Sequence, residues 1–169
     1  HRRKPYSKGT WSAGKFKPFN KIAFKRANDI GQFSDIDLKD FINNKNNHIQ
    51  VLTIGDSYAE ALQVRNSSSF HGILNNKTTQ KKEKIISTSI SASGMAFPNY
   101  IASINYAKTL TDLNEIIIVI PIIANDFDES FKEYAIKGRR GGLGQFYFNK
   151  VSEKMDFVEM PNRQNLTQN

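Results

Sequence analysis

Short apolar runs alternate with amphipathic segments along the chain from residue 49 onward. The runs "IQVLTIG" (49–55), "KIISTSI" (84–90) and "EIIIVIPII" (115–123) predict three buried strands. The third run is apolar on both faces of the strand, which is typical of a central strand in a parallel sheet. Pro121 lacks a backbone donor, so we expect that strand to bulge or to leave the sheet near it.

The segments between these runs predict helices. The first connection predicts helix over 58–64 and again over about 68–76, with Ser67, Ser68 or Ser69 as the cap of the second piece. The second connection predicts a helix over 97–110 with Pro98 in its first turn. The expected inward-facing residues are Phe70, Ile73 and Leu74 in the first connection, and Phe97, Ile101, Ile104 and Ala107 in the second.

Two further elements flank this pattern. A short helix is expected over 34–44, with Ser34 as its cap and with Ile36, Leu38, Phe41 and Ile42 as its apolar contacts. Residues 144–160 predict two strands around "KVSEK", which is a β-hairpin.

The β-α-β-α-β order predicts an α/β protein: a three-layer, doubly wound parallel sheet with right-handed crossovers and a C-terminal hairpin. We divide the chain into a basic extended N-terminal arm (1–33), an α/β core with the first three strands (34–136), and a flexible loop, hairpin and tail (137–169).

The net charge of +8 belongs to the arm. Residues 1–26 hold nine Lys and Arg residues and no acid, whereas the other 143 residues are nearly neutral. Aromatic side chains lie between the basic ones. One interpretation of this pattern is that the arm contacts RNA or an anionic surface. The favoured interpretation is a solvated extension or one that wraps the body, so no nucleic-acid partner is expected.

Composition excludes several classes of protein. The chain contains no cysteine, which excludes disulfides, cysteine-based zinc sites and a cysteine nucleophile. No window holds 18 apolar residues, so no membrane span is expected. The sequence assigns no compartment; a bacterial periplasmic or secreted location is slightly favoured over a cytoplasmic one.

Small polar residues follow each of the three predicted strands. Gly55-Asp56-Ser57, residues 91–94 and Ala124-Asn125-Asp126 should meet at one edge of the sheet, where ligands of open α/β sheets bind. Each of these residues has an ordinary structural interpretation as well. A serine after a strand can be an exposed nucleophile or a helix cap, a glycine can be a turn residue, and an asparagine can donate to an oxyanion or close a turn.

Together the three strand ends resemble the SGNH or GDSL family of serine esterases and acyltransferases. "IGDSYAEALQV", "SISASGMAFPNY" and "IIIVIPIIANDF" are similar to its first three sequence blocks, and "RANDIGQFSD" resembles the lead-in of bacterial acyl-ester members. Two positions depart from the pattern: Tyr58 stands where the family has leucine, and Ile123 stands where it usually has glycine.

The resemblance implies a flavodoxin-like sheet and a role for each block. Ser57 would be the nucleophile, Gly94 and Asn125 would complete the oxyanion hole, and Asp56 would support them. The substrate class would be a small acyl ester or an acetylated carbohydrate, and no cofactor or metal is expected. A divalent cation at Asp56, Asp126 and Asp128 is the less favoured interpretation.

The base that should activate Ser57 is missing from the pattern. The family uses a histidine from a late Asp-x-x-His block, and this chain contains only His1, His48 and His71 and no such block. His48 precedes the first strand, and His71 is expected to be a surface or packing residue. Only three of about five family strands are visible, so we expect the catalytic histidine and aspartate beyond residue 169. The alternatives are a catalytically inactive binding or assembly domain and an O-acetyltransferase that uses the same site.

Overall fold

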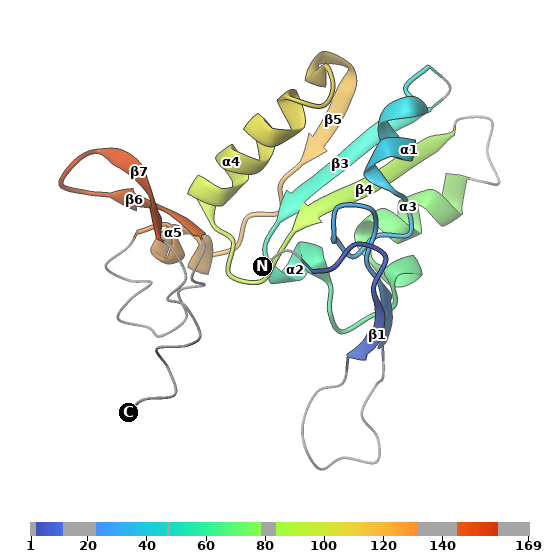
Figure 1. Ribbon diagram of the computed structural model, residues 1–169, viewed down its shortest axis with the longest axis horizontal. Helices are drawn as coiled ribbons and strands as arrows, with labels where there is room; N and C mark the ends of the chain where they lie inside the picture. The colour runs from blue at the N-terminus through green and yellow to red at the C-terminus, as the bar shows by residue number, and fades with distance from the viewer. Residues whose placement is uncertain (1–2, 12–22, 47, 79–83, 132–144, 159–169) are drawn as a thin grey trace, which may run out of the picture.

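The computed structural model describes residues 3–11, 23–46, 48–78, 84–131 and 145–158. At its centre lies a parallel sheet of β3 (Ile49–Gly55), β4 (Ile85–Ser91) and β5 (Ile116–Val119) in the order β4-β3-β5 (Figure 1). The prediction of an α/β protein built on these three parallel strands is confirmed. The order, with the first strand between the second and the third, agrees with the start of a flavodoxin-type sheet.

Helices cover the two faces of this sheet. The pairing of Leu52 with Thr88 and of Ile54 with Ile90 sets one face. Its apolar side chains pack with α1 (Leu38–Asn43) and α4 (Phe97–Lys108) in the hydrophobic core. The helix α3 (Phe70–Thr78) packs on β4, on the side of the strands away from α4 (Figure 1). Right-handed crossovers in opposite directions along the sheet require this arrangement.

The third strand differs from its prediction as a central strand. Among the described residues β5 pairs only with β3, so it lies at the edge of the sheet, and Ile117 is 53% exposed. The strand ends at Val119, two residues before Pro121, as expected for a residue that cannot donate to the ladder.

The helix over 34–44 is shorter than predicted, and Ser34 is not its cap. The N-cap position of α1 is Asp37, whose side chain makes no capping hydrogen bond. Instead the carboxylate of Asp29 accepts hydrogen bonds from the backbone N–H groups of Leu38 (2.6 Å) and Lys39 (3.1 Å). A preceding loop therefore satisfies the free donors at the start of this helix.

The first connection also contains less helix than predicted. The helix α2 covers only Ser57–Glu60, and Ala61 ends it in the left-handed conformation, with φ 50°. A short 3₁₀ helix, η1 (Asn66–Ser68), then precedes α3. The Ser69 hydroxyl accepts from the backbone N–H of Gly72 at 3.3 Å, so Ser69 is the cap among the three serines proposed.

The predicted inward face of α3 is wrong. Phe70 is 49% and Ile73 40% exposed, whereas the buried residues of the first turn are His71 and Gly72. The reason is the polar character of the neighbouring strand edge. The side-chain amide of Asn75 accepts from the N–H of Ser87 (2.7 Å) and donates to its carbonyl (2.9 Å), as a further strand would.

The predicted inward stripe of α4 is confirmed at three of its four positions: Ala107 is buried, and Phe97 and Ile104 pack against the core. The fourth residue, Ile101, is 40% exposed. This helix also packs against the hairpin of β6 (Gln145–Asn149) and β7 (Lys154–Val158). The Asn99 amide exchanges two hydrogen bonds of 3.1 Å with the backbone of Phe146 in β6.

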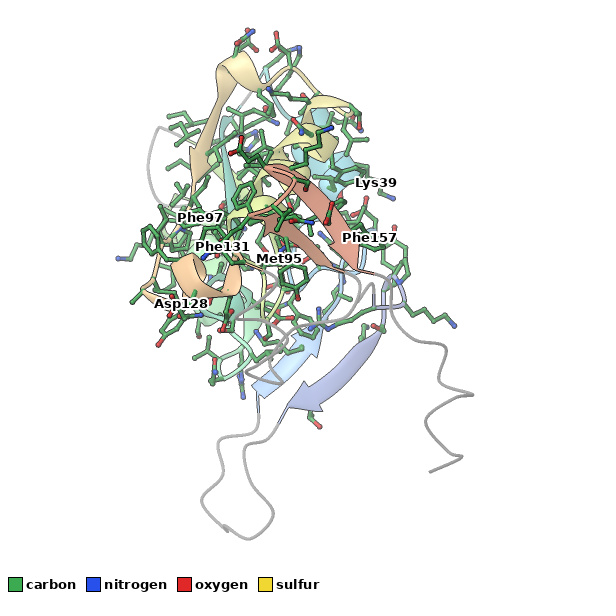
Figure 2. The ribbon with its side chains drawn as sticks, turned by 90° about the vertical axis from the view of Figure 1, so that its left-hand side faces the viewer. Lys39, Met95, Phe97, Asp128, Phe131 and Phe157 are labelled. Atoms are coloured by element: carbon green, nitrogen blue, oxygen red, sulfur yellow. The ribbon has the colours of Figure 1, made fainter. Side chains whose placement is uncertain are left out.

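The C-terminal hairpin was predicted, and its antiparallel pairing is confirmed. An aromatic contact joins β6 to the segment that follows β5, and a second contact lies close by in sequence. Phe131 contacts Phe148 at 6.2 Å between ring centroids, and Phe97 lies at 5.0 Å from Phe127. Figure 2 shows Phe97 and Phe131 on this side of the molecule. The predicted loop 137–144 and the tail after residue 160 lie outside the described residues.

The described part of the N-terminal arm forms a hairpin that packs on the core. The strands β1 (Lys8–Trp11) and β2 (Ala23–Arg26) pair antiparallel, and the sequence analysis did not predict them. Arg26 donates to the Asp37 carboxylate at 2.8 Å, and the Asn28 side chain accepts from the N–H of Gln32 at 2.9 Å. Polar side chains thus hold this segment against the start of α1.

Gly72→Ala should destabilise the protein by about 1–3 kcal/mol or more, because overpacking a rigid contact strains the backbone. A Cβ at residue 72 would lie 1.9 Å from the backbone oxygen of Asn66. Gly9→Ala is the matched control, since a Cβ there would meet nothing within 4 Å. Urea unfolding of both variants measures the difference, and equal stability of the two would contradict the packing described.

Candidate functional site

The turn after β3 places Ser57, the first residue of α2, at the carboxyl end of the central strand. Asp56 is the N-cap of α2: its Oδ1 accepts from the N–H of Tyr58 at 2.9 Å. The interpretation of Ser57 as the helix cap is therefore wrong. The half-buried Ser57 side chain has one hydrogen bond within the described residues, a weak one of 3.3 Å from Oγ to Asp56 Oδ2.

Gly55 allows this turn to be tight. A Cβ at residue 55 would lie 2.7 Å from the Cβ of Ala59 and 3.3 Å from Cγ of Pro121. No larger residue fits without movement, so the glycine brings the β3–α2 turn against both the next helical turn and the segment after β5.

The second strand end forms a turn that contacts α2. Gly94 has φ +82°, a left-handed conformation that favours glycine. Beside it, the backbone N–H and the hydroxyl of Ser93 both donate to Glu60 Oε2, at 2.9 and 2.5 Å. Glu60 is 1% exposed and also pairs with Arg3. This buried carboxylate therefore holds the Gly94 turn and the N-terminal arm to the helix of Ser57.

The third strand end positions Asn125 as the first residue of α5 (Asn125–Glu129). Its half-buried side chain has no hydrogen-bond partner among the described residues. The turn before it is held by Asp126, whose Oδ2 accepts from the N–H of Ile123 at 2.9 Å. Asp126, and not Asn125, therefore supplies the side chain that holds this turn.

The three strand ends lie together, as predicted. Gly55 approaches Pro121, which connects the first end to the third, and Ser93 binds Glu60, which connects the second to the first. The backbone N–H of Phe97 in α4 donates to the Ser130 hydroxyl at the end of α5 at 3.1 Å, so the helices that follow the second and third ends also contact each other.

Buried carboxyl groups line the base of this site. Burial raises the pKa of Asp126, and the charge of Asp56 raises it further, against the N–H of Ile123, which lowers it. Burial likewise raises the pKa of Tyr100, with the nearby charges of Asp126 and Asp56 acting in the same direction.

Neither described histidine serves Ser57. His48 lies at the opposite end of β3, as expected. His71 is a packing residue: it is 1% exposed, and its Nε2 lies 2.9 Å from the Ser69 hydroxyl. Burial lowers the pKa of His71 to about 4, so its imidazole is neutral near pH 7.

Sequence reasoning missed Glu60, Arg3 and Lys25 as residues that shape this region. Glu60 stands one turn after Ser57 in "SYAEAL", and an acid among small and apolar residues was the available signal. The contacts of Arg3 and Lys25 with α2 had no local signal, because both residues precede it by more than 30 positions.

The described residues contain no group of three or more His, Asp or Glu residues that could hold a metal ion. Within the same ranges, no helix is long and apolar enough to cross a membrane.

Comparison with known proteins yields no match: no family model, no curated protein and no solved structure is similar to the chain. Fold and site define the chain as an α/β protein with polar residues gathered at the carboxyl ends of three parallel strands.

Asp126→Asn should stabilise the protein near pH 7. A raised carboxyl pKa means that stability is highest below the unfolded-state pKa and is lost as the pH rises through the folded-state value. Asparagine keeps an acceptor for Ile123 and carries no charge, so the advantage of the variant should shrink toward pH 3–4. Thermal unfolding against pH measures this. Asp128→Asn, at an exposed position of the same helix (Figure 2), should show no such pH-dependent difference.

His71→Gln should weaken the acid sensitivity of the fold. Because burial lowers the pKa of His71 to about 4, stability should be lost as the pH falls from the unfolded-state value toward 4. The loss attributable to this group is on the order of 3 kcal/mol. Denaturant unfolding at pH 7 and pH 4.5 would show a smaller difference for the variant, and an unchanged difference would contradict this assignment.

Proposed function

We propose that this chain carries the nucleophile and the oxyanion hole of an SGNH-type serine hydrolase acting on carboxylic esters. The observation that carries the proposal is the Ser57 hydroxyl: it is partly exposed at the end of the central strand, and it does not cap its helix. Two contacts support it: Ser93, next to Gly94, binds Glu60 of α2, and Gly55 lies against Pro121 in the segment that leads to Asn125.

In the proposed reaction Ser57 Oγ attacks the ester carbonyl carbon and passes its proton to a base. The backbone N–H groups of Ser57 and Gly94 and the side-chain amide of Asn125 donate to the resulting oxyanion. The alcohol leaves with the proton, and water releases the acyl group from the serine. A small acyl ester such as an acetylated carbohydrate is the proposed substrate class, on the sequence resemblance.

The base is the part of this proposal that the described residues do not supply. A serine hydroxyl is a weak nucleophile without a proton acceptor. His71 is enclosed with Ser69, and His48 lies at the far end of the strand. The proposal therefore requires a base from outside the described residues.

The absence of a base among the described residues favours a second candidate function. If no base is supplied, the chain would be a catalytically inactive binding or assembly domain. Transfer of the acyl group to an alcohol, as in an O-acetyltransferase, is the third candidate, since it needs the same serine and oxyanion hole and differs only in the acceptor.

Ser57→Ala in the full-length gene product should lower hydrolysis of p-nitrophenyl acetate by about 10⁴-fold or more, to near background. Asn125→Ala should lower kcat by about 10²–10³-fold with a smaller change in KM. Ser67→Ala is the matched control, because Ser67 is an exposed serine outside the site.

Three results would separate the candidates. Full activity of Ser57→Ala would refute the nucleophile assignment. A folded full-length protein without esterase activity would favour the binding domain. Acetylation of an added carbohydrate in place of release of acetate would favour the transferase.

A further inference from the structure

A cavity of about 320 Å³ lies between the β1–β2 hairpin and the end of α2. Its lining includes Arg3, Lys8 and Lys25, together with Phe33 and Leu62, and no acidic side chain. Pockets of a few hundred Å³ are the size that small-molecule ligands occupy. The cavity is separate from the three strand ends that form the candidate active site.

Lys25 is an unusual residue to line such a cavity, because a lysine is rarely so buried and this one is only 2% exposed. Its Nζ donates to the carbonyl of Ala61 at 2.7 Å and lies 5.3 Å from the centroid of the Phe33 ring. Burial lowers its pKa to about 8, partly offset by the charge of Glu60. An ammonium group held in this way is stabilised by any anion that enters.

Arg3 contributes a second buried donor. Its guanidinium stacks on Phe33 at 3.9 Å and pairs with Glu60 through Nη2. Its Nη1 is buried and has no acceptor among the described residues. A charged donor without an acceptor is costly, so the site lacks a partner that an oxyanion would supply.

The charges around the cavity also favour an anionic ligand. Glu60 is the carboxylate that pairs with Arg3, and it is shared with both donors of Ser93. Lys8 is exposed on β1 at the opening. Three basic residues therefore line the cavity, and the carboxylate of Glu60 is already paired with Arg3 and Ser93.

We propose that this cavity binds a small molecule through a phosphate or carboxylate group, whose oxygens accept hydrogen bonds from Arg3, Lys8 and Lys25. The cavity is larger than a single such group, so the remainder of the ligand lies against Phe33 and Leu62. This site is independent of the proposed ester hydrolysis.

The test is a titration of the full chain with sodium phosphate and, separately, with sodium acetate, at constant ionic strength and pH 7. Binding is followed by two-dimensional NMR at the amides of Gly9 and Thr10, which line the cavity. At least one of the two anions should bind saturably, and the comparison identifies which group the site prefers.

Three variants make the assignment specific. Lys25→Met should weaken binding at least tenfold, because it removes the enclosed cation. Lys8→Gln, at an exposed position that cannot disturb the core, should weaken it about threefold. Lys4→Gln is the matched control: it removes the same charge from the same arm but does not line the cavity.

Two outcomes would overturn the proposal. One is the absence of saturable binding of both anions to the unmodified chain. The other is an equal loss of affinity in Lys4→Gln and Lys8→Gln, which would show that the overall charge of the arm attracts the anion and that the cavity does not.

Discussion

The strand β3 is hydrogen-bonded along both edges, to β4 over Ile49–Gly55 and to β5 from residue 50 to residue 53. The parallel direction of both pairings requires a crossover on each side, and right-handed crossovers in opposite directions place α3 and α4 on opposite faces. All three strands then end at the same edge of the sheet. The turns with Ser57, Gly94 and Asn125 meet there for this reason, whatever chemistry they perform.

Buried polar groups hold the N-terminal arm, α3 and the C-terminal hairpin in position around the central sheet. Glu60 binds both Ser93 and Arg3, so one carboxylate joins the candidate active site to the N-terminal arm. Asn75 and Asn99 each place a side-chain amide against the backbone of an edge strand, β4 and β6 respectively. Such pairings satisfy N–H and C=O groups that would otherwise be left unpaired at a sheet edge.

The strands and the three polar strand ends could be predicted because their signal is local. A run such as residues 49–55 is apolar regardless of its neighbours, and the burial of β3 follows. The inward face of α3 could not be predicted in this way. Phe70 and Ile73 look like core residues by spacing, yet α3 turns Asn75 and His71 inward, because the surface that it meets is polar.

The sequence by itself determined where the three strands of the central sheet run, that they are parallel, and that Ser57, Gly94 and Asn125 share one edge, because apolar periodicity and chain direction are properties of the chain. Only the tertiary structure decided that Asp56 caps α2 in place of Ser57, that β5 lies at the edge of the described sheet, and that Arg3 and Lys25 enclose a cavity beside α2. These features depend on groups that are distant in sequence and compete for the same donors and surfaces. Their outcome is set by packing, which no local pattern records.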